Sequence, residues 1–195
     1  MKILLFGFGS FPGVEVNHTS DLVLEINSEE AIAGLIIRSC VLPVDFQTVN
    51  NIIEKEIIGF NPDYSVLTGI KPGAEIIYLE KVALNVISSK IADNSGNYAN
   101  GEKILQGGRE AFFSSIDLNF IKQKLYANKI DSEISYFAGT YLCNQSYYIS
   151  CALMNKLKGK PDSMFVHLPS AEVGSDNYVI QYFAVKSIIF GLQEI

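Results

Sequence analysis

Short continuous apolar runs alternate with amphipathic segments along most of the chain. Glycine, proline or polar residues bound each run, a pattern typical of strands that are buried on both faces of a parallel sheet. These runs predict strands over residues 3–8, 35–41, 64–67, 134–137 and 164–168.

The segments between these runs repeat apolar residues at helical spacing. Between residues 46 and 60, Val49, Ile53 and Ile57 share one face and charged residues occupy the other. Further helices are expected from a cap at Thr19 or Ser20 to residue 26, over 118–128, from Cys143 to about 159, and over 177–191. The last helix is expected to bury one apolar stripe, formed by Val179, Ile180, Phe183, Ala184, Ile188 and Ile189.

Strands and helices thus alternate in chain order, which predicts a doubly wound sheet with right-handed crossovers. The region 76–88 is interpreted as a further strand, 111–115 as a short strand, and the polar region 91–108 as a long surface excursion. We therefore predict an α/β protein: residues 1–195 form a single-domain, three-layer α/β/α fold around a twisted, mostly parallel open sheet. Because ligands bind beyond the carboxyl ends of such strands, the loops after Phe6, Leu67, Phe137 and Val166 are expected to converge.

Composition and charge exclude several classes of function. Of the 195 residues 48% are hydrophobic and 18% are charged, and the net charge is −6, so neither nucleic acid nor an anionic membrane surface is an expected partner. No apolar segment is long enough to span a membrane. Three cysteines cannot form a complete disulfide set, and two histidines without a CxxC motif make a metal site improbable. These features favour a reduced, cytoplasmic protein.

Cys143 lies where an apolar strand turns into a helix. Small residues at 138–140 allow a sharp turn, and a helix N-terminus favours the nucleophilic thiolate form of a cysteine. The alternative is a small buried hydrophobe, which is what most free cysteines are.

A cysteine nucleophile needs a base and a group that orients the base. His167 ends an apolar strand at the expected ligand edge, whereas His18 lies in a polar segment where a surface or capping role suits it. Glu80 is a carboxylate in an apolar strand, and such a group needs a partner. His167 could instead be a core histidine, and Glu80 could pair with Lys81 or Arg109. The glycine-rich loop 7–13 lacks the third glycine of a dinucleotide-binding motif, so phosphate binding is not expected.

Several blocks of the chain resemble the pyroglutamyl peptidases, a family of cysteine peptidases. The most specific is Ala138-Gly139-Thr140-Tyr141-Leu142-Cys143-Asn144, which is similar to the family's nucleophile block. Further blocks, in the family's order, lie at residues 7–13 with Asn17, 41–44, 61–69, 80–85, 91–96 and 166–169.

The resemblance implies a role for each candidate residue. Cys143 would be the nucleophile, His167 the general base and acid, and Glu80 the residue that orients His167. The pocket for the five-membered lactam ring would be formed by Phe8, Phe11, Ile91, Tyr141 and Leu142. The implied partner is a peptide with an N-terminal pyroglutamate, no cofactor or metal is implied, and the family resemblance suggests a homo-oligomer, either a dimer or a tetramer.

Four positions depart from the family's pattern: Pro12, His18, Ala74 and the segment 170–173. Ala74 stands where many members carry an arginine. The departures at Pro12, Ala74 and Ser170 motivate one alternative, an amidase or lactam hydrolase that acts on a different small substrate. A second alternative is a binding module that keeps the pocket without catalysis, since a fold alone does not fix a function.

Overall fold

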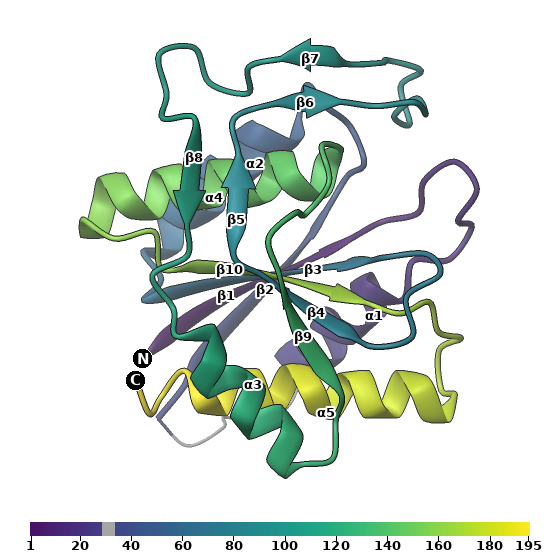
Figure 1. The fold of residues 1–195 in the computed structure, drawn as a ribbon, viewed down its shortest axis with the longest axis vertical. Helices are drawn as coiled ribbons and strands as arrows, with labels where there is room; N and C mark the ends of the chain where they lie inside the picture. The colour runs from purple at the N-terminus through teal and green to yellow at the C-terminus, as the bar shows by residue number, and fades with distance from the viewer. Residues whose placement is uncertain (29–33) are drawn as a thin grey trace.

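A six-stranded sheet forms the centre of the molecule (Figure 1). The computed structural model describes residues 1–28 and 34–195. The strand order is β2-β1-β3-β10-β4-β9. β2, β1, β3 and β10 run parallel, β4 is antiparallel to β10, and β9 is parallel to β4. The bounds are β1 Lys2–Phe8, β2 Ile36–Leu42, β3 Tyr64–Ile70, β4 Ile77–Glu80, β9 Ser132–Ser135 and β10 Ser163–Leu168.

Helices cover both faces of this sheet (Figure 1). One face packs against α2 (Val49–Phe60) and α4 (Leu142–Lys158), and the other packs against α1 (His18–Ser28), α3 (Leu118–Ala127) and α5 (Asp176–Gly191). Each face has its own apolar core. The predicted three-layer α/β/α class and the mostly parallel sheet are confirmed. None of the helices in the described ranges has the length and apolar composition required to cross a membrane.

The region 76–88 is not one strand, as predicted, but three: β4, β5 (Val82–Leu84) and β6 (Ile87–Ser88). The chain leaves the central sheet at Lys81, whose ammonium donates to the carbonyl oxygens of Ser114 and Ile116 at 2.6 and 3.3 Å. β5 then pairs with β8 (Ala111–Phe113), and β6 pairs with β7 (Asn100–Glu102). The predicted excursion 91–108 therefore contributes a strand to a small ribbon above α4 (Figure 1).

The apolar stripe predicted for the last helix is only half right. Ala184, Ile188 and Ile189 are buried, whereas Val179, Ile180 and Phe183 are exposed. The buried side of α5 also includes Tyr178, Gln181 and Val185. The helix itself carries apolar residues on all of its sides, so its sequence alone does not indicate which side faces the sheet.

His18 is also placed differently from the prediction. It is the first residue of α1 and is buried, with its Nε2 2.7 Å from Oε1 of Gln181. The Gln181 amide donates to the carbonyl oxygen of Pro169, so Gln181 Oε1 is the acceptor of a His18 N–H. The cap of α1 is Asn17 rather than Thr19 or Ser20, because the Asn17 side chain accepts the Thr19 N–H at 3.2 Å.

Candidate active site

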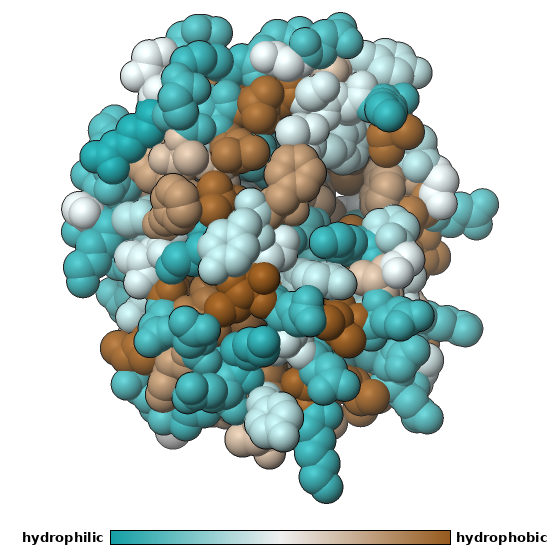
Figure 2. Space-filling model, viewed as in Figure 1, coloured by the Kyte–Doolittle hydropathy of each residue, from teal (hydrophilic) through white to brown (hydrophobic). Residues whose placement is uncertain are grey.

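A cavity of about 370 Å³ opens at the edge of the sheet where β1, β3 and β10 end. On the right of Figure 2, where these strand ends lie in Figure 1, the surface is hollowed between apolar side chains. The cavity is lined by Phe8, Phe11, Asn17, Val44, Gly69, Ile70, Lys71, Pro72, Ile91, Phe137, Ala138, Gly139, Tyr141, Leu142, Cys143 and His167. Its walls are mostly apolar, as is usual for a site that binds a small molecule.

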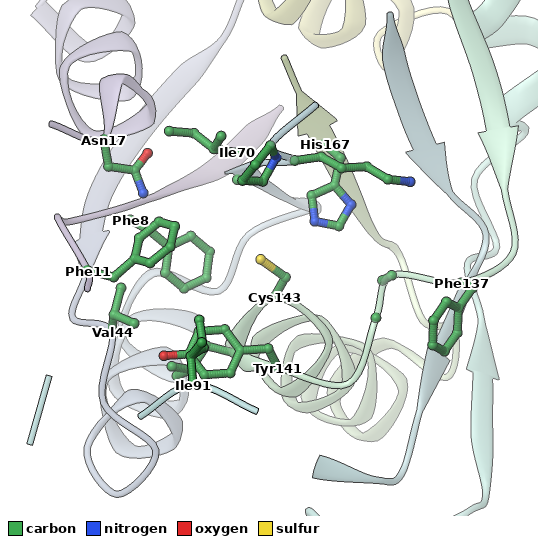
Figure 3. A pocket seen from close by; sticks show the side chains of 16 residues that line it. Phe8, Phe11, Asn17, Val44, Ile70, Ile91, Phe137, Tyr141, Cys143 and His167 are labelled. Atoms are coloured by element: carbon green, nitrogen blue, oxygen red, sulfur yellow. The ribbon is translucent and has the colours of Figure 1, made fainter. Parts of the chain in front are cut away.

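Cys143 projects into this cavity from the first turn of α4 (Figure 3). The N-cap residue Tyr141 makes no side-chain cap hydrogen bond, whereas Asp117 and Ser175 cap α3 and α5 with their side chains. The first N–H groups of α4 therefore have no helical acceptor and no side-chain cap, which is the arrangement that binds anions. Gly69 makes room for the thiol, because a Cβ there would lie 3.2 Å from the Cys143 Sγ.

Two buried amides fix the start of α4. The Asn144 side chain accepts the Leu84 N–H and donates to the Leu84 carbonyl oxygen, both at 2.9 Å. Gln145 donates to the Phe46 carbonyl oxygen at 2.9 Å. These bonds tie the helix N-terminus to β5 and to the segment that precedes α2. The sequence analysis missed both residues, although a run of polar residues directly after Cys143 on a buried helix was an available signal.

His167 is on β10, where it faces the cavity and lies next to Cys143 of α4 (Figure 3). Its Nδ1 is 2.7 Å from Oε1 of Glu80, which is fully buried at the end of β4. The sheet register explains this contact, since Glu80 pairs with Phe165 and His167 is two residues further along on the same face. Tyr147 on α4 donates to the Glu80 carbonyl oxygen at 2.9 Å and holds the end of β4 in place.

The surroundings of His167 favour its protonated form. Burial alone would lower the pKa, but hydrogen bonding and charge attraction with Cys143 and Glu80 outweigh burial and raise the pKa of His167 to about 9. An imidazolium at neutral pH is the partner that a cysteine thiolate requires.

The alternatives considered for these residues are not what the structure shows. Glu80 pairs with His167 rather than with Lys81 or Arg109. All three cysteines are free. Burial and the charge of Glu56 raise the pKa of Cys40 to about 11, and burial raises the pKa of Cys151 well above its ordinary value. Cys143 is the thiol that lines the cavity.

The five residues predicted for the lactam pocket all line this cavity: Phe8, Phe11, Ile91, Tyr141 and Leu142. Phe8, Phe11, Ile91 and Tyr141 lie together with Val44 on one side of the Cys143 thiol (Figure 3). We call Phe8, Phe11, Val44, Ile91 and Tyr141 the apolar slot.

The wall of the apolar slot is held in place by a turn at Asp93. The Asp93 carboxylate accepts backbone N–H groups of Phe46, Ser95 and Asn97, and these bonds outweigh its burial and lower its pKa. Tyr141 donates its hydroxyl to the Ala92 carbonyl oxygen at 3.0 Å. The first part of the segment 91–108 is therefore part of the site rather than a surface excursion.

The predicted loops do converge at the cavity, but the loop after Phe137 does so for a different reason than the one predicted. β9 ends at Ser135, not at Phe137, and it runs opposite to β10, so its carboxyl end does not lie at the cavity. The segment 136–141 instead runs back along the sheet and brings Ala138 and Gly139 to the cavity.

Other residues of the cavity were not predicted: Asn17, Val44, Ile70, Lys71, Pro72 and Phe137. The departures Ala74 and Ser170 lie together in a separate hollow, and neither they nor Pro12 line the cavity that holds Cys143.

A thiol beside an imidazole that a buried carboxylate orients is the arrangement of a cysteine hydrolase.

Comparison with known proteins gives the family. The sequence model of the family described as pyroglutamyl peptidase matches residues 1–188. The pyrrolidone-carboxylate peptidase of Pyrococcus furiosus is 34% identical over 170 residues, which are 87% of this chain and 81% of the relative. That of Thermococcus kodakarensis is 33% identical over 193 residues, which are 99% of this chain and 93% of the relative. A crystal structure of the Pyrococcus furiosus enzyme matches 100% of this chain and 99% of its own with a TM-score of 0.91 at 32% identity. The chain belongs to the pyroglutamyl peptidase family.

Proposed function

We propose that this protein is a cysteine exopeptidase that removes N-terminal pyroglutamate from peptides, with Cys143 as nucleophile, His167 as general base and acid, and Glu80 as the residue that orients His167. The observation that carries the proposal is the contact of His167 with both Cys143 and Glu80 beside an apolar slot. Membership of the pyroglutamyl peptidase family supports the same substrate.

The apolar slot suits a pyroglutamyl group. The lactam ring is flat, small and uncharged, and it would pack between Phe8, Phe11 and Tyr141. Leu142 and Ile91 would complete the enclosure. A free N-terminal amine would lose its hydration in such a slot without gaining a partner, so unblocked peptides are expected to bind poorly.

Acylation begins with the thiolate of Cys143 and the imidazolium of His167. The sulfur attacks the carbonyl carbon of the pyroglutamyl residue, and the oxygen acquires negative charge that the uncapped N–H groups of α4 stabilise. When the C–N bond breaks, His167 gives its proton to the departing amine. A thioester on Cys143 and a neutral His167 remain.

Deacylation uses the same groups in reverse. Neutral His167 takes a proton from water, and the resulting hydroxide attacks the thioester carbonyl carbon. The C–S bond breaks, pyroglutamate leaves, and the thiolate and imidazolium are restored. Glu80 accepts the Nδ1–H throughout, so Nε2 is the nitrogen that exchanges the proton. The groups that act in these steps are the side chains of Cys143, His167 and Glu80, the backbone N–H groups at the start of α4, and water.

Neither alternative function is favoured. A related amidase with another small substrate was motivated by Pro12, Ala74 and Ser170, and none of these residues lines the cavity. A binding module without catalysis would have no need of the Glu80–His167 contact.

We further propose that residues 1–195 form one domain, that the protein is a homo-oligomer, and that it acts in the cytoplasm. The family match over residues 1–188 and the continuous six-stranded sheet support the first proposal. Exposed Ile180, Phe183 and Phe190 on α5 support an interface between copies. A catalytic thiol that must stay reduced supports a reducing compartment.

The proposed function is tested with aminomethylcoumarin amides. The protein is expected to release the fluorophore from the pyroglutamyl amide and not from the prolyl or alanyl amides. Prior treatment with iodoacetamide is expected to stop the reaction. A folded protein that cleaves all three amides equally, or none, would contradict the proposal.

The pH profile gives a separate prediction. His167 must be protonated to release the amine, and its raised pKa of about 9 means that the imidazolium persists below that pH and is lost above it. Activity is therefore expected to fall on the alkaline side near pH 9. In Glu80→Gln the carboxylate that stabilises the imidazolium is absent, so the fall is expected at lower pH. Measuring kcat/KM from pH 6 to 10 gives the alkaline fall in activity for the wild type and for the variant. A fall at the same pH in both proteins would argue against this role of Glu80.

A further inference from the structure

The two sides of His167 differ in the residues that they offer to a substrate. Phe8 ends β1 and Val44 follows β2, and both strands lie on one side of β10 in the sheet. β4 and β9 lie on the other side, and Phe137, which follows β9, lies across Cys143 from the apolar slot (Figure 3). If the pyroglutamyl ring fills the slot, as the proposed function requires, the departing peptide extends toward β4 and β9.

Lys71 brings a positive charge to this second side. It follows β3, and its N–H donates to the Leu168 carbonyl oxygen at the end of β10 at 2.9 Å. Its ammonium lies 4.0 Å from the centre of the Tyr78 ring. Tyr78 is on β4 and pairs with His167 in the sheet. The Lys71 side chain therefore crosses the end of β10 and places its charge on the side of the departing peptide.

The charge of Lys71 is available to a ligand. Among the residues that line the cavity, Lys71 alone carries a lysine or arginine charge. In the part of the chain that the structure describes, Lys71 forms no ion pair, although Lys103 and Lys124 do. Glu133, the partner of Tyr78 on β9, is exposed and forms no ion pair there either. The net charge of the chain is −6, so the protein as a whole repels anions. The Lys71 ammonium provides a local positive charge that can attract one.

We propose that Lys71 is a specificity residue that selects substrates with a carboxylate just after the pyroglutamyl group. The carboxylate can be an aspartate or glutamate side chain at the second position, or the free C-terminus of a pyroglutamyl dipeptide. The Tyr78 ring holds the ammonium in place, and exposed Phe137 offers apolar contact to the rest of the departing residue.

The experiment compares kcat/KM for pyroglutamyl-glutamate whose C-terminus is amidated and whose side-chain carboxylate is free with kcat/KM for the isosteric pyroglutamyl-glutamine amide, which has no carboxylate. An exposed ion pair of this kind corresponds to a preference of roughly three- to fivefold for the glutamate substrate, and it should shrink as salt is added. Lys71→Gln should remove the preference, Lys71→Glu should reverse it, and Lys71→Arg should retain it. A second pair, pyroglutamyl-alanine with a free or an amidated C-terminus, separates the two sources of the carboxylate.

Lys122→Gln is the matched control, since it makes the same change of charge on exposed α3, which packs on the opposite face of the sheet from α4. Its ratio should equal that of the wild type. If the wild type cleaves the glutamine substrate but the ratio is one, or does not respond to Lys71→Gln, the role of Lys71 is refuted and the proposed function stands. If no pyroglutamyl substrate is cleaved, both are refuted.

Discussion

Cys143→Ala is expected to lower kcat/KM for a pyroglutamyl amide by roughly 10⁴-fold or more, because no acyl-enzyme can form without the thiol. The substitution removes one sulfur atom at the wall of an open cavity, so the fold should persist. Activity is measured with the coumarin amide, and thermal unfolding shows that the variant is folded.

Cys40→Ala is the matched control for this prediction. Cys40 is also half-buried, but it lies on β2 and its raised pKa of about 11 keeps it a neutral thiol. This variant is expected to keep the wild-type rate and its sensitivity to iodoacetamide. If Cys143→Ala kept more than a few per cent of the wild-type rate, the nucleophile would be another group.

His167→Gln is expected to lower kcat by roughly 10²- to 10⁴-fold, the range for loss of a general acid–base group. The same variant should lose its fast reaction with iodoacetamide, since the thiolate of Cys143 no longer has an imidazolium partner. A protein in which His167 only filled the core would lose stability without this loss of thiol reactivity.

The apolar slot serves as an internal control for the histidine variant. In the proposed mechanism the apolar slot binds the lactam ring without His167. Pyrrolidone, which is the free lactam ring, should therefore still bind His167→Gln and raise its melting temperature. A variant that keeps its rate within tenfold of the wild type, while it remains folded, would contradict the assignment of His167 as the base.

The sequence predicted the start of the helix at Cys143 and the strand that carries His167, because both depend on local patterns, but the strand predicted to end at Phe137 ends at Ser135. Small residues allow the turn, and apolar runs indicate buried strands. The direction of β4 and β9 could not be predicted in this way. It depends on pairing between segments far apart in the chain, such as Glu80 with Phe165, and on the hydrogen bonds of Lys81 that end β4.

The buried polar contacts were the hardest to predict. His18 reads as a surface residue because its neighbours are polar, yet it is buried against Gln181 on α5, which lies 163 residues away in the chain. Asn144 and Asp93 likewise find their partners in other elements. A polar side chain shows no periodic signal that would distinguish a buried partner from water, so these positions need the three-dimensional structure.

The most direct test of the account is detection of the acyl-enzyme. The wild type is mixed with excess pyroglutamyl amide, quenched with acid within the first turnover, and analysed by mass spectrometry of the intact protein and of its peptides. We predict a mass increase equal to one pyroglutamyl group, on Cys143 and not on Cys40 or Cys151, which disappears when the substrate is exhausted. Turnover of the substrate with no adduct on Cys143, or with the adduct on another residue, would contradict the account.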